Sequence, residues 1–417
     1  MTGDTPPPRP PSYGKQVALV LQGGGALGSY QAGVYEALVS SEYVPDWVAG
    51  ISIGAVNAAI IAGNAPENRV ARLRAFWEEI TSPTALWPSG LVGPLAVAQQ
   101  KASALAALIF GQPGFFTPRP PIDWWSASQP ASYYDTAALK RTLERLVDFD
   151  RINRDKSMRL SVGAVNVRTG HLVYFDNREI AMRPEHVMAS AALPPGFPCV
   201  EIDGERYWDG GLVSNTPLQY VLDYYPRRSR LCFQVDVFHA YGEPPRNLDQ
   251  VTEREKEIRY ASRTRVSTEA FREKHEVRHA INELYELLSD DIKSTEQAKL
   301  LYALSCVTTM DIVQLIYRPF EPQGATKDYE FSRATMNARW KQGISDTHTT
   351  LSASPWLAPQ PPHVGVRVFD VMHDILVRVL GSDRATDRIP GSPLLAGIRR
   401  SNYGNSKRFP NSSEVRS

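Results

Sequence analysis

Apolar and polar positions follow two alternating periods along the first eighty residues of the chain. The run Val17–Leu21 is entirely apolar and is followed by glycines, a pattern typical of a strand buried in a parallel sheet. Residues 29–39 carry apolar side chains at helical spacing, and residues 47–49 form a second short strand. Small residues at 55–62 predict a helix that packs closely against a sheet. This alternation predicts a parallel α/β layer architecture.

Strand patterns return farther along the chain, between segments of other character. Arg159–Val167 and Leu172–Phe175 predict a hairpin, and Leu231–Asp236 predicts a further strand. The residues before this hairpin, at 83–130, break the rhythm because they are rich in Pro, Gly, Trp and Phe and carry little charge. We interpret them as an insertion into the α/β domain.

The composition shifts again near residue 250. Residues 251–304 are highly charged and predict helices, Asp311–Tyr317 predicts one more strand, and residues 329–344 predict another helix. The apolar segment Val364–Leu380 is expected to be a helix that packs within the molecule. The expected organisation has four parts: a disordered Pro-rich leader (1–15), an α/β domain (16–245), a helical C-terminal extension (246–358) and a partly disordered tail (359–417).

Composition excludes some classes of function. The 417 residues carry a formal net charge of +1, which gives no support for binding nucleic acid or an anionic membrane surface by bulk charge. Cys199, Cys232 and Cys306 are isolated in apolar surroundings and predict reduced core residues. The N-terminus lacks a secretory signal, and no run of 18 apolar residues predicts a membrane-spanning helix. We expect a cytoplasmic protein, with peripheral membrane contact left open.

Glycine-rich turns follow the first two predicted strands. Gly23-Gly24-Gly25-Ala26-Leu27-Gly28 offers unencumbered backbone N–H groups, and Gly50-Ile51-Ser52-Ile53-Gly54 places a serine between small residues. A serine in such a strand-to-helix turn is held exposed in a strained conformation, the geometry of a nucleophile elbow. A nucleophile together with anion-stabilising donors indicates acyl transfer.

Ser52 needs a group that accepts its proton. An α/β-hydrolase would use a histidine after a terminal strand, and none of the chain's histidines has that position: His171, His186, His239, His275, His279, His348, His363 and His373. The best-placed acid is Asp209, which precedes two glycines. A carboxyl group with an ordinary pKa of about 3.9 is a weak base at neutral pH, so this role calls for partial burial that raises the pKa.

Three motifs, in their order and separation, resemble those of the patatin-like phospholipases: Gly23-Gly24-Gly25-x-x-Gly28, Gly50-x-Ser52-x-Gly54 and Asp209-Gly210-Gly211. Secondary matches are Ala55-x-Asn57-Ala58, Ala189-Ser190-Ala191-Ala192 and Asn215-x-Pro217. The resemblance covers roughly residues 16–240, and Glu330–Met336 looks like the C-terminal extension of one bacterial branch of the family.

The resemblance implies a three-layer α/β/α fold with a mainly parallel central sheet and a helical C-terminal extension. It also implies a serine lipid acyl hydrolase that acts on a lipid or ester substrate through an acyl-enzyme, without metal or other cofactor. Ser52 would be the nucleophile and Asp209 its base. The oxyanion hole would comprise Gly23, Gly24, Gly25 and Ile53, with the N–H groups of the last three as donors. The supporting motif residues would be Gly28, Gly50, Gly54, Asn57, Gly210 and Gly211.

Some alternatives stay open within this interpretation. The family commonly has Arg or Lys where this chain has Leu27, which weakens the expectation of a phospholipid substrate more than that of hydrolysis. A Ser-His-Asp esterase, an intracellular polyester depolymerase and a non-catalytic lipid-binding homologue are the alternative functions. The insertion at 83–130 could line an acyl-chain channel, contact a lipid surface, or simply pack over the sheet.

Two other motifs point to different chemistry and are rejected. Gly23-x-Gly25-x-x-Gly28 fits a dinucleotide fingerprint, but the acidic residue that should end the second strand is missing, since Asp46 precedes that strand. His275-Glu276-Val277-Arg278-His279 spells a zinc-protease motif. An arginine within it and charged neighbours indicate a solvated helix, and no third ligand follows.

Overall fold

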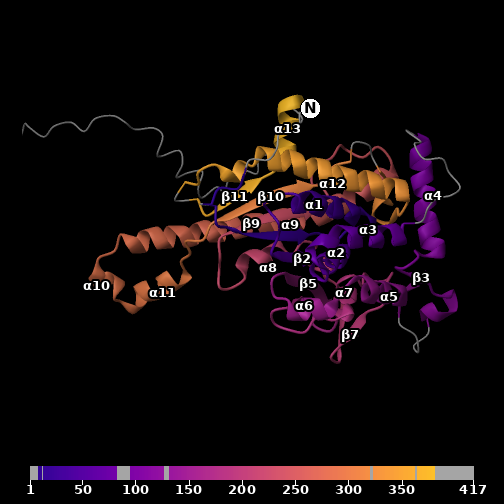
Figure 1. The fold of residues 1–417 in the computed structure, drawn as a ribbon, viewed down its shortest axis with the longest axis horizontal. Coiled ribbons are helices and arrows are strands. Elements are labelled where there is room, and N and C mark those ends of the chain that lie inside the picture. The colour runs from indigo at the N-terminus through magenta and orange to yellow at the C-terminus, as the bar shows by residue number, and fades with distance from the viewer. Residues whose placement is uncertain are drawn as a thin grey trace, which may run out of the picture. The chain divides into compact units, whose positions relative to one another are not determined.

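The computed structural model describes residues 8–11, 13–81, 94–125, 131–319, 323–361 and 364–380 (Figure 1). The chain forms two compact units, residues 1–375 and 376–417. Of the second unit, only the end of one helix belongs to the described residues.

A nine-stranded, mainly parallel sheet forms the centre of the part that the structure describes. The strand order is β11-β10-β9-β1-β2-β5-β8-β7, with β6 on β5, and neighbours from β11 to β5 are parallel. The strands are β1 (Gln16–Leu21), β2 (Trp47–Gly50), β5 (Arg159–Asn166), β6 (Leu172–Asp176), β7 (Val200–Ile202), β8 (Glu205–Asp209), β9 (Arg230–Asp236), β10 (Met310–Ile316) and β11 (Val366–Phe369). Strands β3 (Thr117–Pro118) and β4 (Tyr134–Asp135) pair separately.

Helices cover both faces of the sheet. The α-helices are α1 (Ser29–Val39), α2 (Ile53–Ala62), α3 (Arg69–Ile80), α4 (Pro94–Phe110), α5 (Ala137–Leu146), α6 (Phe149–Arg154), α7 (Pro184–Ser190), α8 (Leu218–Asp223), α9 (Leu248–Glu286), α10 (Asp290–Lys293), α11 (Glu296–Leu304), α12 (Arg333–Ala353) and α13 (Val371–Leu380). Short 3-10 helices are η1 (Gly25–Gly28), η2 (Pro66–Asn68), η3 (Pro121–Trp125), η4 (Gly210–Leu212), η5 (Lys327–Tyr329) and η6 (Pro355–Leu357).

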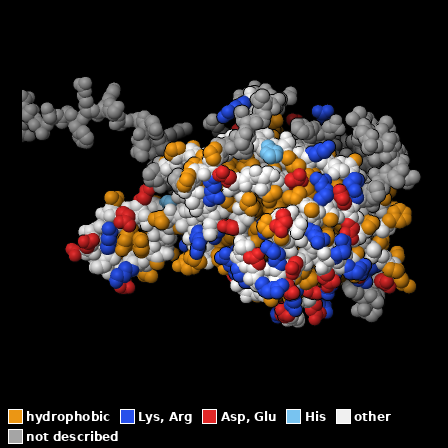
Figure 2. All heavy atoms as spheres, in the orientation of Figure 1, with side chains coloured by type: hydrophobic (Ala, Val, Ile, Leu, Met, Phe, Trp, Pro, Cys, Tyr) orange, Lys and Arg blue, Asp and Glu red, His pale blue; other side chains and the backbone are white. Residues whose placement is uncertain are grey.

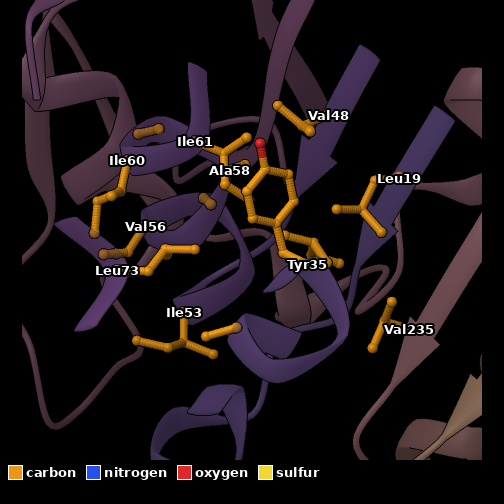
Figure 3. Packing of buried hydrophobic residues seen from close by; sticks show 14 of the residues in the cluster. Leu19, Tyr35, Val48, Ile53, Val56, Ala58, Ile60, Ile61, Leu73 and Val235 are labelled. Atoms are coloured by element: carbon orange, nitrogen blue, oxygen red, sulfur yellow. The ribbon is translucent and has the colours of Figure 1, made fainter. Parts of the chain in front are cut away.

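Alternate side chains of the strands divide the core into two layers. Leu19 of β1 and Val235 of β9 face the layer formed by α1, α2, α3 and α12, where the Tyr35 ring lies between strand and helix side chains (Figure 3). Val20 of β1 and Cys232 of β9 face the other layer, against α8 and the middle of α9. Strands buried on both faces read as continuous apolar runs, which is why β1 was recognisable in the sequence. The predicted three-layer α/β/α fold is thus confirmed.

The C-terminal extension is built into this architecture. Helix α12 lies against α1, far from it in sequence (Figure 1), because glycines on both helices let the backbones touch. A Cβ on Gly33 of α1 would lie 2.0 Å from the Trp340 carbonyl oxygen, and one on Gly343 would lie 2.3 Å from that of Tyr30. Side chains larger than hydrogen therefore cannot be accommodated at this crossing without moving a helix.

Most predicted elements in the described residues are confirmed, including the strand at 311–317 as β10. One prediction is wrong: the segment Val364–Leu380 is not a single helix but β11 followed by α13. The run Val366–Phe369 pairs in parallel with β10, and this pairing with the sheet outweighs its helical spacing. The predicted leader is described only at residues 8–11 and 13–15, where the Tyr13 hydroxyl and Lys15 Nζ contact Asp311 at 2.7 and 2.6 Å. The structure describes residues 94–125 of the predicted insertion, while 83–93 and 126–130 lie outside the described residues.

Candidate active site

Ser52 lies in the sharp turn between β2 and α2. Its backbone has φ 56° and ψ −126°, a left-handed conformation that is strained for a residue with a side chain. The flanking glycines make the turn sterically feasible: a Cβ on Gly50 would lie 2.2 Å from the Gly54 carbonyl oxygen, and one on Gly54 would lie 2.4 Å from that of Leu21. The Ser52 N–H donates to Ser190, to its carbonyl oxygen at 3.2 Å and its Oγ at 3.1 Å. The predicted elbow is therefore present.

Asp209 reaches Ser52 because of the way β5 is paired. Strand β2 lies along one edge of β5 and ends where Gly50 is opposite Val162. Strand β6 occupies the other edge, so β8 pairs with the edge that β2 leaves vacant. There Asp209 is opposite Ala164, two residues beyond the end of β2, or about 7 Å along the strand. The turn after β2 and the carboxylate at the end of β8 therefore meet.

The Asp209 carboxyl group is only 2% exposed. Its Oδ1 accepts a hydrogen bond from the Gly211 N–H at 2.7 Å, and the Ser52 hydroxyl lies near the carboxylate. Burial raises the pKa of Asp209 to about 7, while the Gly211 N–H and the Ser52 hydroxyl lower it by favouring the ionised form. The carboxyl group is thus half-ionised near neutral pH and can accept a proton there.

The glycine turn after β1 lies across from Ser52 and presents its backbone. Gly23 lines the cavity beside Ser52, but its N–H already donates to the Asn215 carbonyl oxygen at 3.0 Å. Among the described residues, the N–H groups of Gly24, Gly25 and Ile53 have no acceptor. Ile53 begins α2, so its N–H adds the positive end of a helix to the site. Unpaired backbone donors of this kind are able to stabilise a developing negative charge.

Buried amides fix this turn relative to the elbow. Asn57 of α2 donates to the Gly28 carbonyl oxygen and to Gln31 Oε1, both at 3.0 Å, and accepts from Trp77 Nε1 at 3.0 Å. Gln31 in turn donates to the Gln22 carbonyl oxygen at 2.6 Å. All of these groups are buried, where an unpaired amide is costly. Asn57 thus links the helix that follows the nucleophile to the end of the glycine turn.

Asn215, part of the Asn215-x-Pro217 motif, fixes the glycine turn. Its Nδ2 donates to the Gly23 carbonyl oxygen at 2.9 Å, and its own carbonyl oxygen accepts from the Gly23 N–H. This pair of hydrogen bonds joins the segment after η4 to the glycine turn. Gly210 and Gly211 form η4 directly after Asp209, and Asn215 follows in the same segment. Nothing in the sequence indicated which backbone group the amide would bind.

A cavity of about 300 Å³ opens above Ser52 and Asp209. Its walls are mainly apolar and come from the insertion, β4, the proline turn after α7, the segment after β9 and the C-terminal extension: Leu108, Phe115, Phe116, Tyr134, Leu193, Pro194, Pro195, Phe197, Phe238, Tyr260, Tyr329 and Phe331. The segment that follows the insertion is attached to the proline turn by backbone bonds from the Tyr133 N–H to Pro195 and from the Tyr134 N–H to Gly196. Through Leu108, Phe115 and Phe116, the described part of the insertion contributes to a cavity wall.

The C-terminal extension touches the glycine turn itself. A Cβ on Gly25, whose φ is 54°, would lie 2.1 Å from the Asp328 carbonyl oxygen of η5. Arg339 of α12 is buried and donates to the Ala26 carbonyl oxygen at 3.0 Å and to that of Lys327 at 2.9 Å. One guanidinium thus holds the glycine turn and η5 together. The extension is part of the site's support.

The histidines that the structure describes lie outside the cavity above Ser52. His186 Nδ1 accepts from the Arg183 N–H at 2.9 Å, and burial lowers its pKa to about 4. His239 Nε2 pairs with Glu257 at 2.9 Å.

The zinc-protease motif has a structural explanation, and our expectation that its helix face is solvated is wrong. His275 and His279 are buried, and each Nε2 contacts the Thr308 carbonyl oxygen at 2.7 Å. The two imidazoles of α9 thus hold the loop before β10 through its Thr308 carbonyl oxygen. Within the described residues, no group of three or more His, Cys, Asp or Glu side chains could hold a metal ion.

Two family models match the sequence. The model for patatin-like phospholipase matches residues 19–222, and a second model, described as patatin phospholipase, matches residues 258–363. No curated protein matches the sequence significantly.

Several solved structures show partial likeness. VipD from Legionella pneumophila is 15% identical, with a TM-score of 0.35, over 81% of this chain and 67% of that one. Human GIVD cytosolic phospholipase A2 is 12% identical (TM-score 0.30; 52% and 42% covered). ExoU in its complex with SpcU, from the type III secretion system of Pseudomonas aeruginosa, is 16% identical (TM-score 0.25; 71% and 59% covered). Both family models carry the patatin name, and together they match the nucleophile elbow, the Asp-Gly-Gly segment and the C-terminal extension: the chain belongs to the patatin-like phospholipase family.

Proposed function

We propose that this protein is a serine hydrolase of lipid acyl esters, with Ser52 as the nucleophile and Asp209 as its base. The observation that carries the proposal is the position of the Ser52 hydroxyl beside a buried carboxyl group whose pKa is raised to about 7. A base with a pKa near the working pH combines a useful ionised fraction with proton affinity. Family membership supports lipid hydrolysis as the class of reaction.

In the first half of the reaction, Ser52 Oγ attacks the ester carbonyl carbon and its proton passes to Asp209. The negative charge that develops on the carbonyl oxygen is stabilised by the N–H groups of Gly24, Gly25 and Ile53, each worth about 3 kcal/mol in a typical oxyanion hole. The C–O bond of the alcohol then breaks, and Asp209 returns the proton to the leaving oxygen. The acyl group stays on Ser52 as an ester.

In the second half, water replaces the alcohol. Asp209 takes a proton from the water as it attacks the acyl carbon, and the same backbone donors stabilise the second tetrahedral intermediate. Collapse of this intermediate releases the fatty acid and returns the proton to Ser52 Oγ. One carboxylate thus serves both halves, and no step requires a metal ion or histidine.

The cavity walls favour a substrate with an acyl chain. Aromatic rings of the insertion, Phe115 and Phe116, pack against Phe197 and Phe331 in edge-on or tilted arrangements, at centroid distances of 5.3 to 6.5 Å. This lining offers apolar contact and few polar groups beyond the reacting ones. Its volume of about 300 Å³ suits a single chain rather than a whole two-chain lipid.

The surface beside the cavity favours delivery from a lipid aggregate. Exposed apolar side chains gather on α4 and η3: Leu105, Leu108, Ile109, Phe110, Ile122 and Trp125. Leu108 also lines the cavity, so the apolar surface continues into the site. Hydrophobic side chains are visible at this side of the molecule in Figure 2. We propose peripheral contact of this surface with lipid; no described helix is long and apolar enough to span a membrane.

The test is hydrolysis of p-nitrophenyl esters together with labelling by a fluorophosphonate. We expect Ser52→Ala to abolish both, and Asp209→Asn to lose most of the hydrolysis, with the circular dichroism spectrum unchanged in each case. His239→Ala is the control and keeps activity. Full activity of Ser52→Ala would refute the nucleophile, and loss in His239→Ala equal to that in Asp209→Asn would favour a Ser-His-Asp mechanism. No hydrolysis of any ester by the wild-type protein would favour a non-catalytic lipid-binding homologue.

A further inference from the structure

A second cavity, of about 260 Å³, lies at the N-terminal ends of the strands, whereas Ser52 lies beyond their C-terminal ends. It is lined by the residues that begin four adjacent strands, Gln16 of β1, Trp47 of β2, Arg159 of β5 and Arg230 of β9. The active site lies beyond the other ends of these strands. The six residues of β1 separate the two ends of the strands by about 17 Å.

Strand register brings cationic side chains together at these N-terminal strand ends. Gln16 is opposite Arg230 and Trp47 is opposite Arg159. Arg178 and Arg228 complete the wall, so four guanidinium groups line one cavity. Asp46 is the acidic residue in its lining.

One of the four arginines has its charge neutralised inside the protein. Arg159 is buried and pairs with Asp176 at 2.7 Å. Its guanidinium also stacks on aromatic rings, with Cζ 3.9 Å from the Trp47 centroid and 3.5 Å from that of Tyr224. Planar stacking of this kind fixes an arginine in place without a hydrogen-bond partner on its faces.

The other three arginines are not neutralised in this way. Arg230 is 4% exposed, and its Nε has no hydrogen-bond partner among the described residues, although Nη1 donates to Gln16 Oε1 at 3.1 Å. The guanidinium groups of Arg178 and Arg228 form no ion pair or hydrogen bond with any residue that the structure describes, and both residues are exposed. Burial, together with repulsion from Arg159 and Arg228, lowers the pKa of Arg230, an effect that the charge of Asp46 opposes.

A buried donor without a partner is costly, and so is a guanidinium held near others of the same sign. An anion in the cavity would relieve both costs. Phosphate oxygens fit arginine because its planar fork donates two parallel hydrogen bonds. With Asp176 and Asp46 set against the four arginines, two positive charges remain, which match a phosphate dianion.

We propose that this cavity is a binding site for a phosphate group, held by Arg230 from within and by Arg178 and Arg228 from the rim. The phosphate belongs either to a small soluble anion or to the headgroup of a lipid. The site does not bind the ester that reacts at Ser52, because the two cavities lie at opposite ends of the strands. It therefore stands independently of the proposed hydrolase activity.

The experiment uses the exposed arginines, since Arg230 begins a core strand and its replacement could unfold the protein. The double variant Arg178→Gln/Arg228→Gln is compared with Arg145→Gln/Arg259→Gln, which removes the same charge from side chains that are more than half exposed on α5 and α9. Binding of inorganic phosphate is measured by isothermal titration and by the rise in Tm at constant ionic strength, with chloride as the reference salt.

We expect a saturable response to phosphate in the wild-type protein and in the control variant. In Arg178→Gln/Arg228→Gln we expect the affinity for phosphate to fall by about tenfold or more. Sedimentation with phosphatidic acid vesicles, against pure phosphatidylcholine vesicles, identifies the source. Loss of vesicle binding in the same variant assigns the site to a lipid headgroup, and unchanged vesicle binding assigns it to a soluble anion. No saturable response, or an equal loss in both double variants, overturns the proposal. Ser52→Ala should bind phosphate as the wild type does, whatever its activity.

Discussion

Replacing Asp209 by Asn should change how the stability of the protein depends on pH. Burial raises the pKa of this carboxyl group from 3.8 to about 7. Each pKa unit corresponds to about 1.4 kcal/mol, so the ionised carboxylate costs the folded state about 4 kcal/mol once both states are ionised. Asn at this position can still accept the hydrogen bond from the Gly211 N–H and carries no charge at any pH.

The sign follows from proton binding. Between pH 3.8 and about 7 the folded state keeps the Asp209 proton while the unfolded state has lost it. The unfolded state therefore binds fewer protons, and the free energy of unfolding of the wild type falls as pH rises. Below pH 3.8 both states are protonated and the cost disappears. Asp236, also buried with its pKa raised to about 7, contributes equally to both proteins and cancels in their difference.

The assay is urea unfolding of wild type and Asp209→Asn at pH 5 and pH 8. The free energy of unfolding of the variant minus that of the wild type should increase by about 3 kcal/mol between these two pH values. Asp150→Asn, at a carboxyl that is 85% exposed, is the control and should show a constant difference. A constant difference for Asp209→Asn as well would mean that its carboxyl titrates near the ordinary value, and the argument for a base near neutrality would be wrong.

The same titration predicts the pH dependence of catalysis. Asp209 accepts a proton only when ionised, so kcat/KM should rise with pH through about 7. The Ser52 hydroxyl lowers this pKa by favouring the ionised carboxylate, and Ser52→Ala should therefore move the stability transition to higher pH. A flat kcat/KM profile between pH 5 and pH 9 would contradict the assignment of Asp209 as base.

Further predictions concern the surroundings of the site. Gly33→Ala should cost several kcal/mol of stability in urea unfolding, because its Cβ would lie 2.0 Å from a carbonyl oxygen of α12, whereas Gly14→Ala, with nothing within 4 Å, should be neutral; equal midpoints would show that α1 and α12 are not in contact. Phe116→Ala should enlarge the cavity and shift kcat/KM toward longer acyl chains in a series of p-nitrophenyl esters, and an unchanged series would remove this ring from the acyl site. Phe110→Ser/Trp125→Ser should slow hydrolysis of vesicle lipid severalfold but leave a soluble short-chain ester unaffected, whereas equal rates on vesicles would refute contact of α4 and η3 with lipid. Dialysis against EDTA should leave ester hydrolysis unchanged, and a loss restored by calcium would contradict a mechanism that relies on backbone donors.

Local pattern in the sequence was sufficient for much of the fold. The apolar run of β1 and the small residues of α2 are set by burial between layers, which constrains every residue in them. The glycines around Ser52 follow from the steric demands of a single turn. Such features act over a few residues, so they can be recognised without knowledge of distant contacts. The paired strand β11 was missed because a run of four residues, three of them apolar, fits a helix or a strand, and only pairing with β10 decides between them.

The sequence by itself determined which groups are capable of the chemistry: a serine in a glycine elbow, a glycine turn with free backbone donors, and an aspartate before two glycines. The tertiary structure alone decided how they act together. Strand β8 pairs with the part of β5 that lies beyond the end of β2, and this pairing brings Asp209 to Ser52. Burial among distant elements raises the pKa of that carboxyl group. Because the Gly23 N–H donates to the Asn215 carbonyl oxygen, it is not free to bind a substrate oxygen. Strand register gathers arginines at the N-terminal ends of the strands. Pairing, desolvation and register depend on residues tens to hundreds of positions apart, and no local pattern records them.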